Sequence, residues 1–153
     1  MTAITVSCHI DAPVERVFEL ASDLPNAAER IDDITKIEMM TEGPVGVGTR
    51  FRETRIMFKK ECTEEMEINE FVPNERYATV AGSHGCTYRA EFVFTPEGGG
   101  TLVAMNFEST AHTFMAKIMS VMFKFMTGTM VKCVQRDLEC IKKHAEQGAA
   151  AAS

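Results

Sequence analysis

The chain has 153 residues, 45% of them hydrophobic and 25% charged, and its formal net charge at pH 7 is −6. These values predict one globular domain over residues 1–147, and the negative charge, with no dense cluster of Lys and Arg to offset it, excludes nucleic acid as a partner. No apolar run is long enough to span a bilayer and the first residues lack a secretory signal, which predicts a cytoplasmic protein without a transmembrane segment.

Residues 2–10 alternate and are rich in β-branched side chains, which predicts a strand. A short helix is expected to begin near Pro13, where the missing N–H costs nothing, with Asp11 as its cap. A second short helix is predicted after residues 23–25 (DLP) by the same reasoning. The chain therefore opens with a strand and two short helices.

Turn residues divide residues 34–110 into short segments with no helical period between them. The predicted strands are 34–41, 48–57, 60–71, 76–81, 84–95 and 101–110. Connections this short join antiparallel neighbours, because a parallel crossover needs about a dozen residues or more. We therefore expect an antiparallel meander.

One long helix is predicted from about His112 to Gln147, followed by a flexible tail over residues 148–153. Gly128 indicates a bend midway along it. Asp137 shares the helix face of the methionines, and we interpret it as the point where the helix leaves the sheet and meets solvent. The alternative is that Asp137 caps an element or pairs with another side chain. The apolar face itself holds Met115, Met119, Met122, Met126, Met130, Cys133 and Cys140.

Four short motifs carry a resemblance to a known family: residues 10–18 (IDAPVERVF), 45–51 (VGVGTRF), 70–73 (EFVP) and 99–103 (GGTLV). In this order they resemble the START-related superfamily SRPBCC, particularly its polyketide cyclase/dehydrase-like and coenzyme-Q-binding-like branches, over about residues 3–145. The resemblance implies an α+β helix-grip fold. In that fold a curved antiparallel sheet wraps around a long C-terminal helix, and two short helices follow the first strand.

The fold implied by the resemblance encloses a cavity between the concave face of the sheet and the long helix. Successive residues of a strand point to opposite faces of the sheet, so the parity of a residue's position predicts which face its side chain is on. This parity and the helical wheel together predict which side chains face the cavity. The predicted lining residues that are apolar or aromatic are Phe51, Met66, Tyr88, Phe92, Met105, Phe107, Met115, Met119, Met122 and Met126. Thioethers repack around different partners, so a methionine wall suits an adaptable pocket, although a packed core gives the same pattern.

Three charged residues, Glu53, Arg55 and Glu64, are predicted to lie in this cavity or at its mouth. A buried carboxylate is costly unless it is paired, so Arg55 is expected beside an acid, where it can also grip a ligand carbonyl or carboxylate. The alternative is that strand twist leaves all three on a solvated rim. Tyr88 either offers its hydroxyl to a ligand or bonds to the backbone within the core.

Metal and nucleophile chemistry finds little support in the sequence. His84 and Cys86 share one side of a strand, but no third ligand accompanies them at a recognisable spacing, so we predict no metal site. We also expect no cofactor. The five cysteines are an odd number without close-pair spacing, which favours reduced thiols over disulfides.

Three functions fit these features. The first is binding, carriage or sensing of a small hydrophobic molecule that is lipid-, quinone- or polyketide-like. The second is a metal-free cyclase or dehydratase (a lyase) in which Glu53 or Glu64 acts as general base and Arg55 or Tyr88 stabilises an enolate. The third is an adaptor that docks to a protein or peripherally to a membrane through Phe114, Val121 and Phe125. We expect a monomer or a homodimer, and we prefer the first function because no nucleophile with an attendant base can be assembled.

Overall fold

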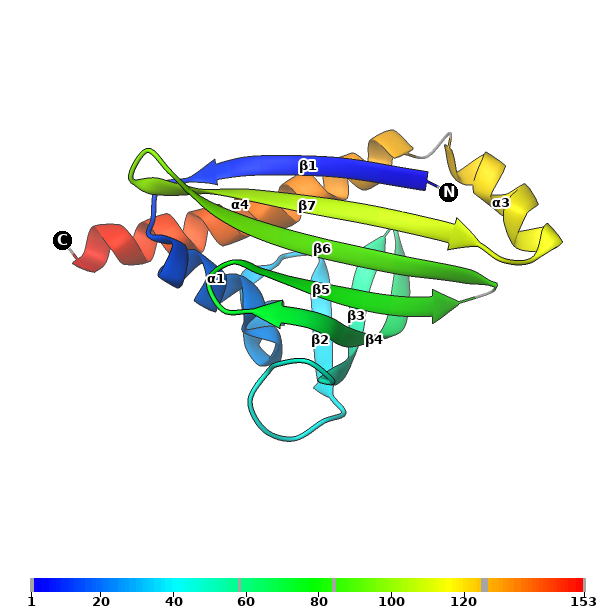
Figure 1. The fold of residues 1–153 in the computed structure, drawn as a ribbon, viewed down its shortest axis with the longest axis horizontal. Helices are drawn as coiled ribbons and strands as arrows, with labels where there is room; N and C mark the ends of the chain where they lie inside the picture. Colours follow the sequence, from blue (N-terminus) through cyan, green and yellow to red (C-terminus); the bar gives the residue numbers. More distant parts are fainter. Residues whose placement is uncertain (1, 58, 84, 125–126, 153) are drawn as a thin grey trace.

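The computed structural model describes residues 2–57, 59–83, 85–124 and 127–152, and Figure 1 shows how they fold. All seven predicted strands are present, with bounds that differ from the predicted ones by at most two residues. The elements in chain order are β1 (Thr2–Ile10), α1 (Val14–Ser22), the 3-10 helix η1 (Leu24–Asn26), α2 (Ala27–Arg30), β2 (Ile34–Met39), β3 (Arg50–Met57), β4 (Lys60–Val72), β5 (Arg76–Ser83), β6 (Cys86–Glu97), β7 (Gly100–Ala111), α3 (Phe114–Lys124) and α4 (Thr127–Ala152).

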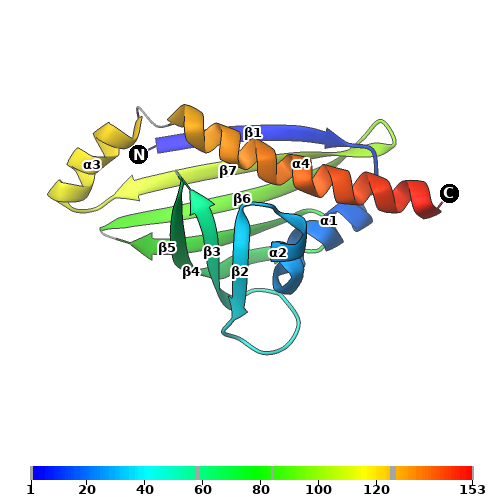
Figure 2. The same cartoon turned by 180° about the vertical axis from the view of Figure 1, so that it is seen from behind.

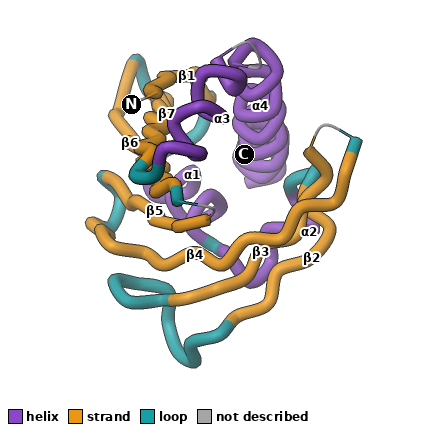
Figure 3. Tube along the Cα trace, turned by 90° about the vertical axis from the view of Figure 1, so that its right-hand side faces the viewer, coloured by secondary structure: helices purple, strands orange, loops and turns teal. Residues whose placement is uncertain are grey.

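The strands form one antiparallel sheet in the order β1-β7-β6-β5-β4-β3-β2. Strands β2 to β7 follow one another as a meander, as their short connections predict, and β1 pairs with the last of them. Figures 2 and 3 show that the sheet is curved and that α4 crosses its concave side. The predicted α+β helix-grip architecture is confirmed.

The main hydrophobic core lies between α1, the C-terminal half of α4 and the strands around β7. Phe18 of α1 makes edge-on ring contacts with Phe94 and Tyr77, at centroid distances of 5.1 and 6.0 Å. Leu138 and Ile141 of α4 are buried in the same cluster. In this half of the molecule, core packing fills the space between the helix and the sheet.

A smaller core cluster lies toward the other end of the sheet, where η1 meets β3 and β4. Its buried members are Leu24, Phe51 and Ile68, and Met66 packs against them. Phe51 and Met66 are cross-strand partners, so their side chains share one face of the sheet, as parity predicts. Both residues point toward the concave side, where they contribute to packing.

The first elements of the chain are bonded to its last helix. The Arg16 Nε of α1 donates a hydrogen bond to the Ala145 carbonyl of α4 at 3.0 Å. The Lys142 ammonium of α4 donates to the His9 carbonyl of β1, also at 3.0 Å. These bonds fix the C-terminal half of α4 across β1 and α1.

Two local predictions are wrong. In place of one helix from His112 to Gln147, the structure describes α3 and α4, whose axes diverge (Figure 2). Asp11 does not cap α1, because Pro13 is the cap residue and no side chain bonds there; the Asp11 carboxylate instead pairs with the His9 ring at 3.0 Å. The bounds of α4 include most of residues 148–153, whose flexibility stays a prediction.

Within the described ranges, no helix is long and apolar enough to cross a membrane.

The hairpin between β6 and β7 leads to a first testable expectation. A Cβ added at Gly100 would lie 2.5 Å from the Ile10 carbonyl oxygen and 2.9 Å from the His9 Nε2. Gly100→Ala is therefore expected to lower the free energy of unfolding by about 1–3 kcal/mol, because backbone atoms must shift. Gly46→Ala is the control, since nothing lies within 4 Å of its added Cβ. Equal urea midpoints for the two variants would contradict this account.

Candidate functional site

A cluster of three charged residues lies between the sheet and α4. Arg55 of β3 donates from Nε to the Glu53 carboxylate at 3.0 Å and from Nη2 to the Asp137 carboxylate at 2.9 Å. The side chains of Glu53, Arg55 and Asp137 are only 16%, 15% and 17% exposed. The prediction that Arg55 pairs with an acid is confirmed, and the second acid comes from the helix opposite.

The strand and the helix position these three side chains by their periodicity. Glu53 and Arg55 are two residues apart on β3, so both point to the concave side together with Phe51. Asp137 lies one turn from Cys133 and close to Leu138 and so reaches inward from α4. We define Glu53, Arg55 and Asp137 as the charged triad.

Burial and mutual attraction shift the pKa values of the triad. Burial alone would lower the pKa of Arg55, but attraction to Glu53 and Asp137, with the hydrogen bonds to both, raises it above its ordinary value. The pKa of Asp137 is raised from 3.8 to about 6, because burial outweighs the opposing charge and hydrogen bond of Arg55, and the nearby Glu53 and Asp33 charges act in the same direction as burial. Asp137 is therefore a carboxylate that can exchange a proton near neutral pH.

Tyr77 of β5 borders the triad, and the sequence analysis did not single it out. Its hydroxyl donates to the Ala21 carbonyl at 3.0 Å. Its pKa is raised well above the ordinary value, first by burial and then by the Glu53 and Asp137 charges. The sequence signal that could have identified Tyr77 as inward-facing was its parity on the predicted strand 76–81. The structure gives Tyr77 the backbone-bonded core position that we had considered for Tyr88.

Tyr88 is only partly buried, and its ring stacks on Phe107 at a centroid distance of 6.1 Å. Burial raises its pKa to about 12, and Cys86 and Glu64 act in the same direction. Phe92 stacks on Tyr77 at 4.9 Å. The concave side of β5 and β6 is therefore lined with aromatic rings, as parity predicts, and Met105 is buried beside them on β7.

The structure separates other predicted residues from the triad. Glu64 is exposed on β4, so for this residue the solvated-rim alternative holds. Met115 is 69% exposed on α3, because that helix diverges from α4 and presents this side chain to solvent. The predicted methionine wall is therefore wrong at Met115. The side chains of Met119 and Met122, and Met126 and His84 as a whole, lie outside the described residues.

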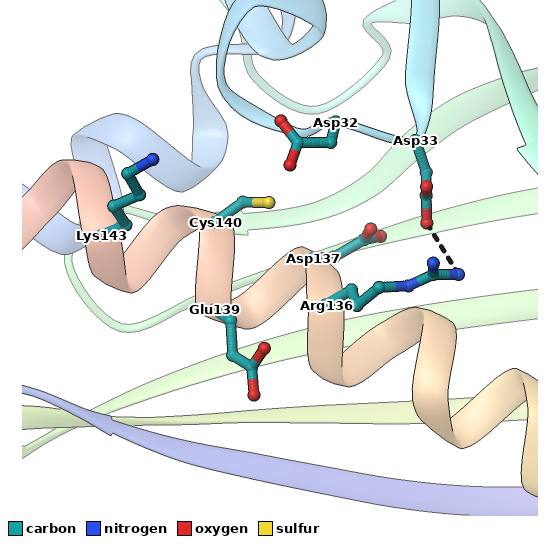
Figure 4. Close-up of a pocket in the computed structure, with 7 residues that line it drawn as sticks. All are labelled: Asp32, Asp33, Arg136, Asp137, Glu139, Cys140 and Lys143. Carbon is teal, nitrogen blue, oxygen red and sulfur yellow. Dashed lines mark ion pairs between the residues drawn. The ribbon is translucent and has the colours of Figure 1, made fainter.

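An open pocket of about 310 Å³ lies behind the triad, between α4 and the turn that precedes β2 (Figure 4). Arg136 and Asp33 pair across it at 3.2 Å. Asp137 lines it as well, and the Oδ1 of Asp137 is buried without a hydrogen-bond partner in the described part of the chain. The lining residues are Asp32, Asp33, Arg136, Asp137, Glu139, Cys140 and Lys143. This polar pocket was not predicted.

The structure decides between the two interpretations of Asp137. The wheel places Asp137 correctly on the inner face, but the preferred interpretation, that it marks the exit of the helix into solvent, is wrong, and the pairing alternative holds because Asp137 pairs with Arg55 in the interior. The pairing depends on β3 lying opposite this turn of α4, which the wheel does not show. Among the described residues, no group of three His, Cys, Asp or Glu side chains is arranged to hold a metal ion.

Comparison with known families gives one match. The family described as polyketide cyclase / dehydrase and lipid transport matches residues 1–146. No curated protein sequence matches the chain.

Solved structures share the fold at low sequence identity. The protein TTHA0849 from Thermus thermophilus is 23% identical with a TM-score of 0.79, and the match covers 99% of this chain and 100% of that one. The Zhui aromatase/cyclase from Streptomyces sp. R1128 is 15% identical with a TM-score of 0.76, covering 99% and 98%. A START superfamily protein from Mycobacterium smegmatis is 11% identical with a TM-score of 0.77, covering 95% and 97%.

Proposed function

The chain belongs to the polyketide cyclase / dehydrase and lipid transport family, and from this premise we propose that it binds a small, mainly apolar molecule between the sheet and α4. Arg55 holds the polar end of this molecule, a carbonyl or carboxylate oxygen. The partly buried aromatic side chains Tyr88 and Phe92 of β6 contact its apolar body.

The observation that carries this proposal is the burial of the charged triad. Removing three charged groups from water costs several kcal/mol each, and apolar side chains of similar volume stabilise a fold as well or better. Stability therefore does not account for the triad. A guanidinium held in the interior, with its position fixed by Glu53 and Asp137, is suited to binding a polar group that arrives in an apolar ligand.

The donor geometry of Arg55 is compatible with that role. A guanidinium has five N–H donors, and the bonds to Glu53 and Asp137 use two of them. We assign the remaining hydrogen-bonding capacity to the ligand. Because the guanidinium is planar and rigid, two of its N–H groups can contact a carboxylate at once, which favours ligands with a carboxylate or an enolised carbonyl.

Binding of a fluorescent fatty acid, 11-(dansylamino)undecanoate, tests the role of Arg55. Arg55→Gln is expected to weaken binding about 10-fold or more, because a charge-assisted hydrogen bond is lost. Arg52→Gln is the matched control, since Arg52 lies on the same strand, is more exposed and pairs with Glu38 at 3.0 Å. It is expected to change the affinity less than twofold, and circular dichroism checks that both variants are folded.

The methyl ester of the same probe separates recognition of the carboxylate from general apolar binding. We expect the ester to bind the unaltered protein and Arg55→Gln with similar affinity. If Arg55→Gln lowers the affinity for neither the carboxylate probe nor its ester, or lowers both affinities equally, Arg55 does not hold the polar end of the ligand. Failure of the unaltered protein to bind either probe, together with no small molecule recovered by mass spectrometry from the purified protein, would defeat the binding function itself.

A second candidate function is catalysis, and the raised pKa of Asp137 favours it. A carboxylic acid with a pKa of about 6 can donate and accept protons at neutral pH. Asp137 would serve as general acid or base, and Arg55 would stabilise an enolate oxygen. Glu53 and Glu64, the bases expected from sequence, are less suitable, because Glu53 is bonded to Arg55 and Glu64 is exposed.

Dehydration of a β-hydroxy ketone, followed by the absorbance of the enone product, tests this candidate. If the protein is an enzyme of this kind, Asp137→Asn abolishes turnover and leaves the affinity for the probe within about threefold. If the unaltered protein dehydrates the β-hydroxy ketone no faster than buffer does, the result would favour binding without catalysis.

A further inference from the structure

The helix α3 carries an apolar face that nothing in the described chain covers. Four of its side chains are largely exposed: Phe114 (78%), Ile118 (47%), Val121 (58%) and Met115 (69%). Ala116, in contrast, is buried against the rest of the protein. Figures 1 and 2 show that α3 lies at one end of the molecule, at the far end from the C-terminus of α4.

The exposed residues form one continuous face. At about 100° per residue, Phe114, Ile118 and Val121 fall within a narrow arc and Met115 extends it, whereas Ala116 lies on the opposite side. Lys117 flanks the arc and is exposed. A helix with an apolar face bordered by lysine has the pattern of helices that lie in the surface of a bilayer.

The distribution of charge identifies the partner. Residues 109–136 contain Lys117, Lys124, Lys132 and Arg136 and no Asp or Glu, which gives this segment a formal charge of +4. The rest of the chain then carries 12 basic and 22 acidic residues, a formal charge of −10, since the whole chain has 16 and 22. This segment is the longest stretch of the chain without an acidic residue, and it includes the exposed apolar helix. The combination is complementary to a membrane of anionic lipids.

We propose that α3 docks the protein onto an anionic lipid bilayer, with Phe114, Met115, Ile118 and Val121 inserted at the boundary between headgroups and acyl chains. With 11 residues, α3 is about 16 Å long and so lies in the surface rather than crossing the bilayer. The net negative remainder of the protein turns away from the lipid and sets the orientation. This inference goes beyond the proposed function and does not depend on it.

Sedimentation with lipid vesicles tests the docking. The protein is expected to bind vesicles of phosphatidylcholine with 30% phosphatidylglycerol and to bind pure phosphatidylcholine at least about 10-fold more weakly. Met115→Glu is expected to lower the partition coefficient about 10-fold or more, because a buried apolar group is replaced by a charge. Val47→Glu is the matched control, since Val47 is also 69% exposed but lies outside α3.

A second pair of variants separates the contribution of basic side chains to vesicle binding from the contribution of the apolar face. Lys117→Gln is expected to weaken binding to anionic vesicles about 5-fold, as one basic residue near the surface contributes about that factor. Lys60→Gln, at an exposed position of β4, is expected to leave binding unchanged. All four substituted residues are exposed, so circular dichroism and urea midpoints are expected to stay the same.

Two results would overturn the docking. One is no binding to anionic vesicles, or equal effects of Met115→Glu and Val47→Glu. The other is a homodimer in light scattering that Met115→Glu converts to monomers, because a second copy of the chain would then cover the face. Binding of the dansylated probe is expected to be the same in Met115→Glu and in the unaltered protein, so the docking can fail without affecting the proposed function.

Discussion

Arg55→Met is expected to lower the free energy of unfolding by about 3–5 kcal/mol, because it leaves two carboxylates buried without their cation. Replacing the whole triad, as Glu53→Leu, Arg55→Met and Asp137→Leu together, is expected to leave that free energy unchanged or to raise it by about 1–4 kcal/mol. The side chains of all three triad residues are mostly buried, so apolar side chains of similar volume can replace them. Urea denaturation at pH 7 measures both changes.

Arg52→Met is the control for the single substitution. Arg52 is 44% exposed and pairs with Glu38 in solvent, so its loss is expected to cost less than about 1 kcal/mol. The triple variant is also expected to lose the preference for the carboxylate probe over its ester while it stays folded. If the triple variant is as unstable as Arg55→Met, the triad is needed for the fold, and the argument from its burial to ligand binding fails.

The stability of the protein is expected to depend on pH through Asp137. Its folded pKa of about 6 lies above the unfolded value of 3.8, so between these values the folded state binds more protons than the unfolded state. The stabilisation from protonated Asp137 is therefore fully present below pH 3.8 and is lost as the pH rises through 6. The expected size of the loss is about 2–3 kcal/mol, at 1.36 kcal/mol per pKa unit.

Asp137→Asn isolates this effect from other carboxylates. Glu70, Glu38 and Asp23 have lowered pKa values, because their hydrogen bonds and ion pairs outweigh desolvation, and they lose stability as the pH falls. Their contribution is common to the unaltered protein and the variant, so it cancels in the difference between the two. That difference, from urea titrations between pH 4 and 7, is expected to change most between about pH 4 and 6, where the folded and unfolded states differ most in bound protons. A difference that is constant over this range would contradict the raised pKa.

The sheet could be predicted from sequence because its signals are local. Strand alternation and turn residues gave all seven strands, and parity placed Phe51, Arg55 and Phe92 on the correct face without any tertiary information. The bulge between Ile68 and Glu70 comes after the predicted inward residues of β4, so it did not reverse their assignment. The two-residue periodicity of a strand is therefore sufficient to predict which face a side chain occupies, as long as the strand stays regular.

The helical part of the site could not be predicted in the same way. The apolar period continues from α3 into α4, so a wheel describes them as one helix, and only packing against β7 and β1 separates their directions. This is why Met115 was expected inside and is exposed. The pairing of Asp137 with Arg55 joins residues 82 positions apart, and no local pattern contains that information.

The bonds between the two ends of the chain also bear on the order of folding during synthesis. β1 pairs with β7, about 100 residues later, and Arg16 bonds to Ala145, which is made later still. At translation rates of about 5–20 residues per second, the first strand is without its neighbour for many seconds. Such distant contacts slow folding, because the loop between them must close before they form. The N-terminal strand therefore stays unpaired until β7 has been synthesised, and folding is expected to complete only after α4 has emerged.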